Sequence, residues 1–318
     1  MSDYDEIDLQ NIKTYSIANR FSKVNTTDFA KPFQKGSSLK QFISNLPDIL
    51  VGSEFKQLID TIVHSYRSDR QIIAMMGAHV IKCGLSPLII QLIEVGIIKC
   101  LALNGAGIIH DTEIANWGIT SEDVAEALND GSFGMAQETA EFINNALENG
   151  HRLELGLGEA VGKKIDESNG RNKHFSILAC GYRKKIPITV HVAIGTDILH
   201  QHSSTNGAII GELSYRDFKI FCAQVAKLNK GSVVLNFGSA VVLPEVFLKA
   251  LTVVRNLGHD SHGFITANFD MLRHYRPQVN VVQRPTQTGG KGYQFTGHHE
   301  IMIPLLVAGI LEGFADKA

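Results

Sequence analysis

The sequence lacks the short motifs that mark several common enzyme classes. It contains no Gly-x-Ser-x-Gly elbow of serine hydrolases, no phosphate-binding loop ending in Gly-Lys-Ser/Thr and no His-Glu-x-x-His zinc motif. Neither sign of charge is in large excess, because 30 Lys and Arg face 32 Asp and Glu and leave a formal net charge of -2. A nucleic-acid-binding protein would carry a basic face. These absences argue against serine hydrolases, nucleoside triphosphatases, zinc peptidases and nucleic-acid-binding proteins.

Cysteine pairs and long apolar runs are also missing. Four cysteines are scattered in or beside apolar runs without a Cys-x-x-Cys motif: Cys83, Cys100, Cys180 and Cys222. This usage is typical of reduced, buried thiols in the cytoplasm. No apolar run reaches about 18 residues, and the acidic start of the chain does not resemble a signal peptide. We therefore expect a cytoplasmic protein without a membrane span.

The chain does have an alternation of apolar runs and amphipathic helical segments. The predicted strands are 71–76, 99–103, 186–193, 233–237 and 263–267, and the predicted helices include 39–45, 54–67, 85–95, 136–147, 156–167, 215–228, 244–257 and 300–314. This alternation predicts an α/β fold, a doubly wound, mostly parallel sheet of Rossmann-like type with helices on both faces. We expect residues 1–36 to form an extended, partly disordered arm and residues 37–318 to form a single domain.

Two local expectations bear on the candidate site. Asn149-Gly150 is expected to close the helix that begins near residue 136, because glycine commonly follows the end of a helix. The segment 275–298 is expected to be irregular, which would place Lys291 in a flexible loop.

The turns that follow the predicted strands carry the residues best suited to bind a ligand. They read Asn-Gly-Ala-Gly (104–107), Gly-Thr-Asp (195–197), Phe-Gly-Ser-Ala (237–240) and Thr-Ala-Asn-Phe-Asp (266–270). Ligands bind at the carboxyl ends of parallel strands, and backbone N–H groups at a following helix suit phosphate. The pattern predicts a nucleotide-type site. Asp197 and Asp270 would accept hydrogen bonds from ribose hydroxyls or a ligand amine, with helix capping as the alternative.

Histidines and lysines offer further chemistry. His200 and His202 follow Asp197, and His298-His299 precede the last helix, but these spacings match no standard zinc pattern, and we expect no metal site. Lys82 and Lys291 could form Schiff bases where desolvation lowers the pKa of the amine. The alternative for each lysine is a solvated or phosphate-pairing role.

The order and spacing of these pieces resemble the deoxyhypusine synthase family. The resemblance extends from about residue 71 to the C-terminus, roughly three quarters of the chain. The segments that carry it are His79–Gly84, Asn104–Gly107, Val190–Asp197, Leu235–Val242, Ile265–Asp270 and Ile301–Ala308.

The resemblance implies a homotetramer that binds NAD near a subunit interface. It also implies that spermidine is oxidised with NAD, and that an active-site lysine passes the aminobutyl group to a lysine of a protein acceptor, a translation factor. The implied cofactor-binding residues are Asn104, Gly105, Gly107, Asp197, Gly238, Ser239, Thr266, Asp270 and His298. Asp111 and Glu245 would hold the ammonium groups of the amine, and Lys291 would trap the electrophile.

The sequence departs from the family at the catalytic lysine, because the family's Trp-Gly-Lys motif is missing. An acidic pair of the family appears as His110-Asp111, and a His-His pair appears as Pro244-Glu245. Two other functions therefore stay open. One is an NAD-binding oxidoreductase or hydrolase that uses no covalent lysine, and the other is a non-catalytic dinucleotide-binding oligomer.

Overall fold

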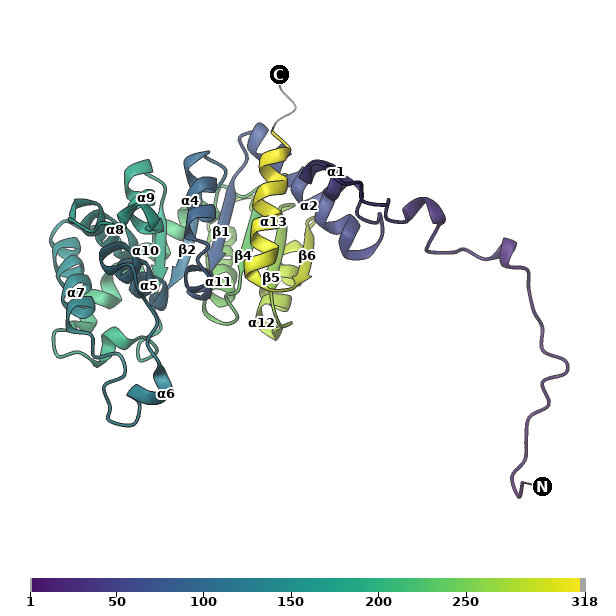
Figure 1. Ribbon diagram of the computed structural model, residues 1–318, viewed down its shortest axis with the longest axis horizontal. Helices are drawn as coiled ribbons and strands as arrows, with labels where there is room; N and C mark the ends of the chain where they lie inside the picture. Colours follow the sequence, from purple (N-terminus) through teal and green to yellow (C-terminus); the bar gives the residue numbers. More distant parts are fainter. Residues whose placement is uncertain (1, 315–318) are drawn as a thin grey trace.

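The computed structural model describes residues 2–314. Its six strands are all parallel and form one sheet in the order β3-β2-β1-β4-β5-β6 (Figure 1). They are β1 (Ile72–Met76), β2 (Cys100–Asn104), β3 (Ile188–His191), β4 (Val233–Phe237), β5 (Ile265–Asp270) and β6 (Lys291–Thr296). Strand order runs outward in two directions from β1 and β4, which is the doubly wound, Rossmann-like arrangement. The predicted fold class is confirmed.

Helices cover both faces of the sheet (Figure 1). They are α1 (Leu39–Ser44), α2 (Leu50–Arg67), α3 (His79–Lys82), α4 (Ser86–Glu94), α5 (Gly105–Trp117), α6 (Val124–Ala127), α7 (Gln137–Arg152), α8 (Leu157–Glu167), α9 (Ile177–Lys184), α10 (Gly207–Val225), α11 (Val242–Asn256), α12 (Tyr275–Pro277) and α13 (His299–Glu312), with a π-helical turn η5 (Gln278–Gln283). Within residues 2–314, no helix has the length and apolar content needed to cross a bilayer.

The core consists of two apolar clusters, one on each face of the sheet. Strand β1 shows the division, because Ile72, Ala74 and Met76 belong to the larger cluster, whereas Ile73 and Met75 belong to the smaller one. Successive side chains of a strand point to opposite faces. A strand that is apolar on both faces is therefore expected in the middle of a parallel sheet.

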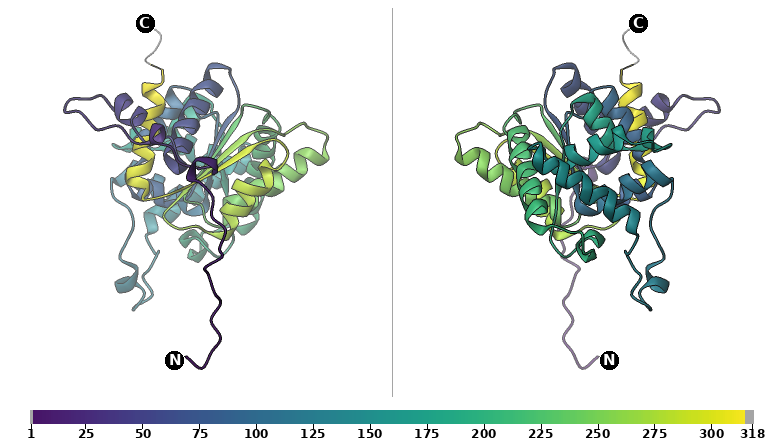
Figure 2. Two further views of the ribbon diagram at one scale, coloured as in Figure 1. Left: turned by 90° about the vertical axis from the view of Figure 1, so that its right-hand side faces the viewer. Right: turned by 90° about the vertical axis from the view of Figure 1, so that its left-hand side faces the viewer.

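The N-terminal arm extends away from the sheet over residues 2–24, and a second excursion, around α6, projects from the opposite end of the molecule (Figures 1 and 2). Farther along, the N–H of Lys31 donates to the carbonyl oxygen of Asn45, and the N–H of Asp48 donates to that of Asp28. Helix α1 begins with a capping box that Ser38 and Gln41 form. The arm bears many exposed large apolar side chains, among them Tyr4, Ile7 and Phe21.

Two of the local expectations are wrong. The segment 275–298 contains α12, η5 and strand β6, whose alternate residues Tyr293 and Phe295 are buried. The helix expected to end at Gly150 continues to Arg152. Gly150 serves packing and not termination, because a Cβ there would lie 2.4 Å from the Cβ of Ala160. Glycine is needed at this position for the close approach of α8. Helices α5 and α9 are also absent from the predicted set.

Candidate functional site

The two central strands end in glycines that approach each other closely. The N–H of Gly77, after β1, donates to the carbonyl oxygen of Phe237 at 3.0 Å, and a Cβ on Gly77 would lie 2.7 Å from the carbonyl oxygen of Gly238. Gly238, after β4, has φ +67°. This is the switch point, where strand order reverses and where ligands bind in such sheets. The structure thus brings the predicted Gly238 to the ligand-binding edge.

Several buried polar atoms at this edge have no hydrogen-bond partner among the described residues. They are Oδ1 of Asn104 at the end of β2, Oδ1 of Asn236 in β4, Oδ2 of Asp270 at the end of β5 and Nδ1 of His299 at the start of α13. Buried polar atoms are nearly always paired, and an unpaired one calls for an explanation such as a missing ligand. Their amide, carboxylate and imidazole groups suit the hydroxyls and amides of a dinucleotide.

Asn236 also belongs to a ladder of side-chain amides that crosses three strands. Asn236 donates to Oδ1 of Asn268 at 2.6 Å, and Asn268 donates to Oε1 of Gln294 at 3.0 Å. These residues are paired in register on β4, β5 and β6. Asn236 also donates to the carbonyl oxygen of Ser239 at 3.0 Å, and the Ser239 hydroxyl accepts from the N–H of Leu243. The ladder therefore fixes the turn that carries the predicted Ser239.

The two histidines at the start of α13 lie in different surroundings, one in solvent and one in the candidate site. His298 is exposed and lies 3.7 Å from Glu300, whereas His299 is 1% exposed. A Cβ on Gly238 would lie 2.4 Å from Nε2 of His299, so only glycine leaves room for this ring. Burial lowers the pKa of His299, partly offset by the charge of Asp270. The buried residue that the sequence reasoning missed is His299, next to the predicted His298.

The start of α5 is occupied by a carboxylate of the chain itself. A Cβ on Gly105 would lie 1.9 Å from Oδ2 of Asp197, and the Asp197 carboxylate accepts from the N–H of Ala106. It also caps the turn that begins at Ile198, and burial raises its pKa. Asp197 therefore has the capping role that was the alternative to ligand binding. Its carboxylate occupies the N-terminus of α5, where a phosphate could otherwise bind. Gly107 lies within α5, against Leu103 of β2.

Thr266 lies away from the ligand-binding edge. It is the second residue of β5, paired in register with Val234 and Gly292, and its hydroxyl is buried without a partner. The predicted strand 263–267 is too short at its carboxyl end, because β5 continues to Asp270. Asp270 is therefore the residue of this segment that reaches the carboxyl edge.

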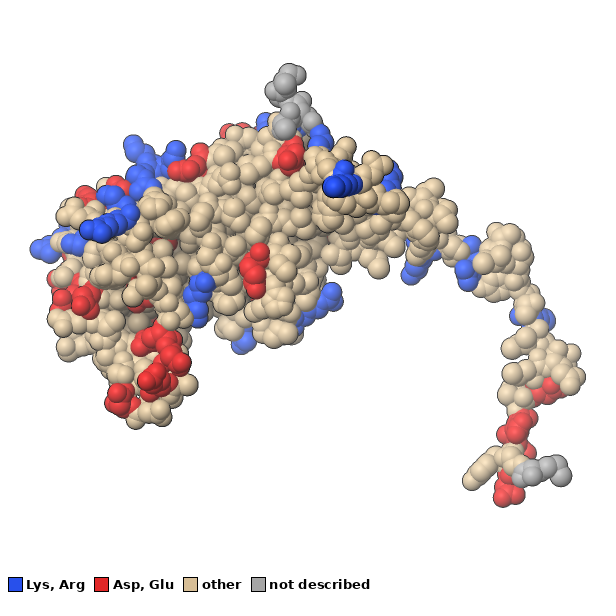
Figure 3. Space-filling model, viewed as in Figure 1, with Lys and Arg blue, Asp and Glu red and all other residues tan. Residues whose placement is uncertain are grey.

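A cavity of about 670 Å³ lies between α5 and the α6 segment, beside this edge. Four acids line it, namely Glu113, Glu122, Glu138 and Asp197, against one cation, Lys82. Its apolar wall includes Trp117 and Phe133. Acidic side chains also gather over the α6 segment in Figure 3. A cavity with net negative charge and apolar walls suits an organic cation.

A chain of hydrogen bonds determines which ring nitrogen of a histidine in this cavity carries a proton. The hydroxyl of Thr120 donates to Glu113, so the contact of 2.6 Å between Thr120 and Nδ1 of His110 requires that Nδ1 donate. Thr139 donates to the other Glu113 oxygen at 3.0 Å. Burial, reinforced by the charge of Lys82, lowers the pKa of His110 to about 4. His110 is therefore neutral at physiological pH, with Nε2 as its acceptor.

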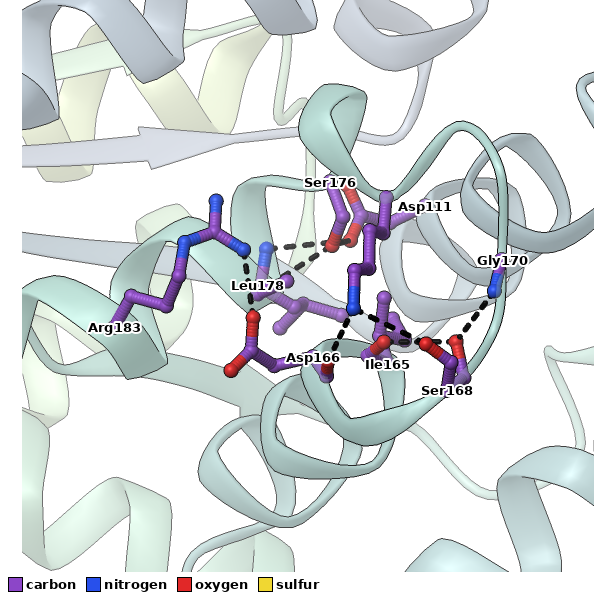
Figure 4. A network of polar contacts seen from close by, with 10 residues as sticks. Asp111, Ile165, Asp166, Ser168, Gly170, Ser176, Leu178 and Arg183 are labelled. Atoms are coloured by element: carbon purple, nitrogen blue, oxygen red, sulfur yellow. Dashed lines mark hydrogen bonds and ion pairs between the residues drawn. The ribbon is translucent and has the colours of Figure 1, made fainter.

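Asp111, which the resemblance assigns to ammonium binding, serves inside the fold. It is fully buried and accepts from the Ser176 hydroxyl at 2.5 Å and from the N–H groups of Ile177 and Leu178 at 2.8 and 3.2 Å (Figure 4). Burial raises its pKa to about 6, against the effect of these hydrogen bonds. Asp111 thus ties the start of α9 to α5, and it does not line the cavity.

The other two predicted catalytic residues also lie apart from the cluster. Glu245 in α11 pairs with Lys249 and lies 3.3 Å from Nε of Arg276, while Asn280 donates to it at 2.9 Å. The hydrogen bond from Lys249 is the main cause that lowers its pKa. Lys291 begins β6, at the amino edge, and its Nζ donates to Gln57 at 2.8 Å. The structure therefore separates Lys291 from the glycine turns by the length of a strand.

Among residues 2–314, no group of three or more His, Cys, Asp and Glu side chains is arranged to hold a metal ion. Of the two lysines singled out from the sequence, Lys82 is the one that lines the acidic cavity, and it forms no hydrogen bond or ion pair with the described residues.

Comparisons with known proteins support the fold. No protein-family model matches the chain, and a search of curated proteins finds no match. Among solved structures, an Entamoeba histolytica protein provisionally assigned as a deoxyhypusine synthase has a TM-score of 0.53 and 12% identity, covering 89% of this chain and 96% of its own.

Two larger proteins contain a similar fold. Apo ArgZ, an arginine dihydrolase from the ornithine–ammonia cycle in cyanobacteria, has a TM-score of 0.51 and 13% identity over 82% of this chain. AgrE, in a ternary complex with ornithine and NAD+, has a TM-score of 0.52 and 13% identity over 82% of this chain. The chain spans about a third of the length of each, 32% and 33%. At these identities the likeness establishes the Rossmann-like fold and no more.

Proposed function

We propose that the chain binds NAD at the switch point and oxidises a small amine. The observation that carries the first half is the set of unpartnered buried polar atoms on Asn104, Asn236, Asp270 and His299, which converge on the carboxyl edge of the sheet. A ligand with many hydroxyl and amide groups would satisfy them. The similar fold of AgrE, whose structure contains ornithine and NAD+, supports the same pairing of dinucleotide and amine.

The residues present fit the cofactor. Gly77 and Gly238 let the ends of β1 and β4 and the ring of His299 pack closely at the switch point. Around it, Asn104, Ser239, Asp270 and His299 would supply hydrogen-bonding groups to the cofactor. When bound, the nicotinamide ring accepts a hydride from the carbon next to a substrate nitrogen. The unpartnered Nδ1 of His299, neutral because of its lowered pKa, is available to accept a proton at this edge.

The acidic cavity beside α5 supports the proposal that the substrate is an amine. Glu122 and Glu138 supply negative charge, Trp117 an aromatic face, and neutral His110 adds no opposing positive charge. These features favour a chain-like amine over an acid or a phosphate. Spermidine is the first substrate to test, because the sequence resembles deoxyhypusine synthases.

We further propose that this oxidation is the first step of an aminobutyl transfer. A lysine of the chain would carry the aminobutyl group to a protein acceptor, and the chain would act as a homotetramer. Lys82 is better suited to carry the group than Lys291, because Lys82 lines the cavity and is unpaired there. Borohydride reduction in the presence of NAD and labelled spermidine should trap an imine on Lys82. Lys82→Ala should abolish the trapping and Lys291→Ala should leave it intact. Absence of an adduct in the wild type would favour an oxidoreductase without a covalent lysine.

The central experiment is a calorimetric titration with NAD, followed by addition of spermidine and measurement of the reduced-nicotinamide absorbance. Saturable binding with reduction would support the proposal. Binding without reduction by any amine would favour a non-catalytic dinucleotide-binding protein. Failure to bind NAD would refute the cofactor assignment.

A further inference from the structure

A thiol, an imidazole and a carboxylate meet at the carboxyl end of β1. Cys83 directly follows α3, and its Sγ lies 3.3 Å from Nε2 of His79, one helical turn earlier. The same sulfur lies 3.8 Å from Oε2 of Glu300, in the first turn of α13. Cys83 is partly exposed, whereas the other three cysteines are buried. The expectation that all four thiols are buried is therefore wrong for Cys83.

This cluster borders the switch point. The ring centroid of His79 lies 6.0 Å from that of His299, whose Nδ1 is buried and unpartnered. His79 lies two residues after Gly77, the glycine that approaches Gly238. The unpartnered histidine is an independent indication that a ligand belongs here. Cys83 is therefore placed to react with a compound bound in the crevice.

We propose that Cys83 is a nucleophilic thiol that captures an aldehyde, with His79 as its general base. The Sγ–carbon bond forms as the carbonyl π bond breaks. The thiol proton passes to Nε2 of His79 and then to the new hydroxyl, so the product is a neutral thiohemiacetal and no oxidant is required. The source of the aldehyde rests on the proposed function: oxidation of a primary or secondary amine gives an imine, which water converts to an aldehyde and the released amine or ammonia.

The surrounding charges keep the thiol protonated until a base acts. Burial is the largest cause that raises the pKa of Cys83, and the carboxylate of Glu300 raises it further, while Lys82 opposes them. His298, which lies 3.7 Å from Glu300, and the buried His299 are the other titratable groups at this end of α13. A thiol with a raised pKa holds little thiolate at neutral pH. The thiol can donate to Glu300 at 3.8 Å, but Nε2 of His79 is the nearer acceptor at 3.3 Å, and we assign the base to it.

Alkylation by iodoacetamide, followed by peptide mass spectrometry at pH 7 without dinucleotide, tests the thiol. We expect label on Cys83 and none on Cys100, Cys180 or Cys222 in the folded protein. His79→Asn should slow labelling of Cys83 by about tenfold or more, since general-base catalysis is lost. Glu300→Gln should accelerate it, because the carboxylate no longer raises the pKa. Equal rates in the wild type and His79→Asn, both shown to be folded by circular dichroism, would overturn the proposal.

Protection by butanal tests the ligand class. Butanal should slow the labelling of Cys83, and dilution should restore the rate, because a thiohemiacetal forms reversibly. Butanol at the same concentration is the matched control and should give no protection. Labelling that butanal does not change would refute aldehyde capture. Neither assay contains NAD, so a failed NAD titration would refute the proposed function and leave the thiol result standing.

Discussion

Gly238 occupies a position at which one methyl group would disturb the candidate site. An alanine there would need a left-handed backbone at φ +67°, and its Cβ would lie 2.4 Å from Nε2 of His299. The backbone strain alone costs about 1–2 kcal/mol. We expect Gly238→Ala to lower the free energy of unfolding by more than this and to weaken NAD binding about tenfold or more, equivalent to at least about 1.4 kcal/mol. Urea unfolding and calorimetry measure the two effects.

Gly195 provides the matched control for this prediction. Its φ is +92°, and a Cβ there would meet nothing within 4 Å. Gly195→Ala should therefore lower the free energy of unfolding by about 1–2 kcal/mol through strain alone, with NAD affinity unchanged. Equal NAD affinity in both variants would mean that the His299 ring does not contribute to the site.

The place of a candidate site residue in the fold was predictable from the sequence only where a turn fixed it. Gly238 lies where its apolar run put it, directly after β4, whereas Asp270 is the last residue of β5 because that strand continues past the predicted end at Ala267. The choice between His298 and His299 depended on the phase of α13, because adjacent helical residues point in different directions and only tertiary packing selects the buried one. Asp111 was misassigned for a related reason: its partners are main-chain N–H groups of α9, a helix that sequence patterns did not reveal.

At the scale of elements, the contact between α7 and α8 makes glycine preferable to alanine at one helical position, against the usual helix propensity. Alanine is favoured over glycine by about 1 kcal/mol in a helix interior, yet a Cβ at Gly150 would lie 2.4 Å from Ala160 and 3.1 Å from Leu213. We expect Gly150→Ala to lower the free energy of unfolding by about 1–3 kcal/mol, the usual cost of overpacking. Gly211→Ala, in α10 with open space around it, should instead raise it by about 1 kcal/mol. Stabilisation by both changes would contradict this account.

Helix α10 also protects the free edge of β3. Asp217 accepts from the N–H of Val190 at 2.7 Å and from the N–H of Gly158 at 2.9 Å, both at Oδ2, while Ser214 accepts from the N–H of Val192 and donates to the carbonyl of Val190. The exposed edge of a sheet invites association with other chains. Side chains of α10 therefore take the place of a seventh strand.

The burial of Asp217 predicts a dependence of stability on pH. Burial raises its pKa from 3.8 to about 7, so the folded state binds its proton more tightly than the unfolded state does. Its contribution should therefore favour folding at low pH and be lost progressively as pH rises from about 4 to about 7. Asp217→Asn can keep both bonds to Oδ2 without ionising. Urea unfolding across this range should show a weaker decline with pH in the variant, and parallel curves would refute the assignment.

The sheet was largely predicted from the sequence, because strands buried on both faces read as continuous apolar runs. Strand β6 was not, because it is an edge strand that alternates exposed and buried residues within a polar stretch. That single omission moved Lys291 from the amino edge of a strand into a loop near the site. In a parallel sheet, an error in one strand boundary thus changes which side of the molecule a residue is assigned to.

On the scale of the whole molecule, apolar side chains are exposed in several places, and two of these sets bear on assembly. The arm carries them along its length, and its backbone over residues 2–24 forms hydrogen bonds only within itself among the described residues. A second set lies in the turns after the strands and at the start of α13, namely Ile194, Val241, Leu272 and Ile301. Extensive exposed apolar surface usually marks an interface. Both features favour the predicted homo-oligomer.

The final prediction separates these two surfaces. Light scattering on the full chain should give a mass above the 34.8 kDa of one copy. If the arm holds the assembly together, a variant without residues 1–24 should dissociate, while Leu272→Asp and Ile301→Asp should not change the mass. The opposite pattern would place the interface at the carboxyl edge, where a second copy would cover the unpartnered Asp270 and His299 and could complete the site. A monomeric full chain would show that one copy alone must bind the ligand.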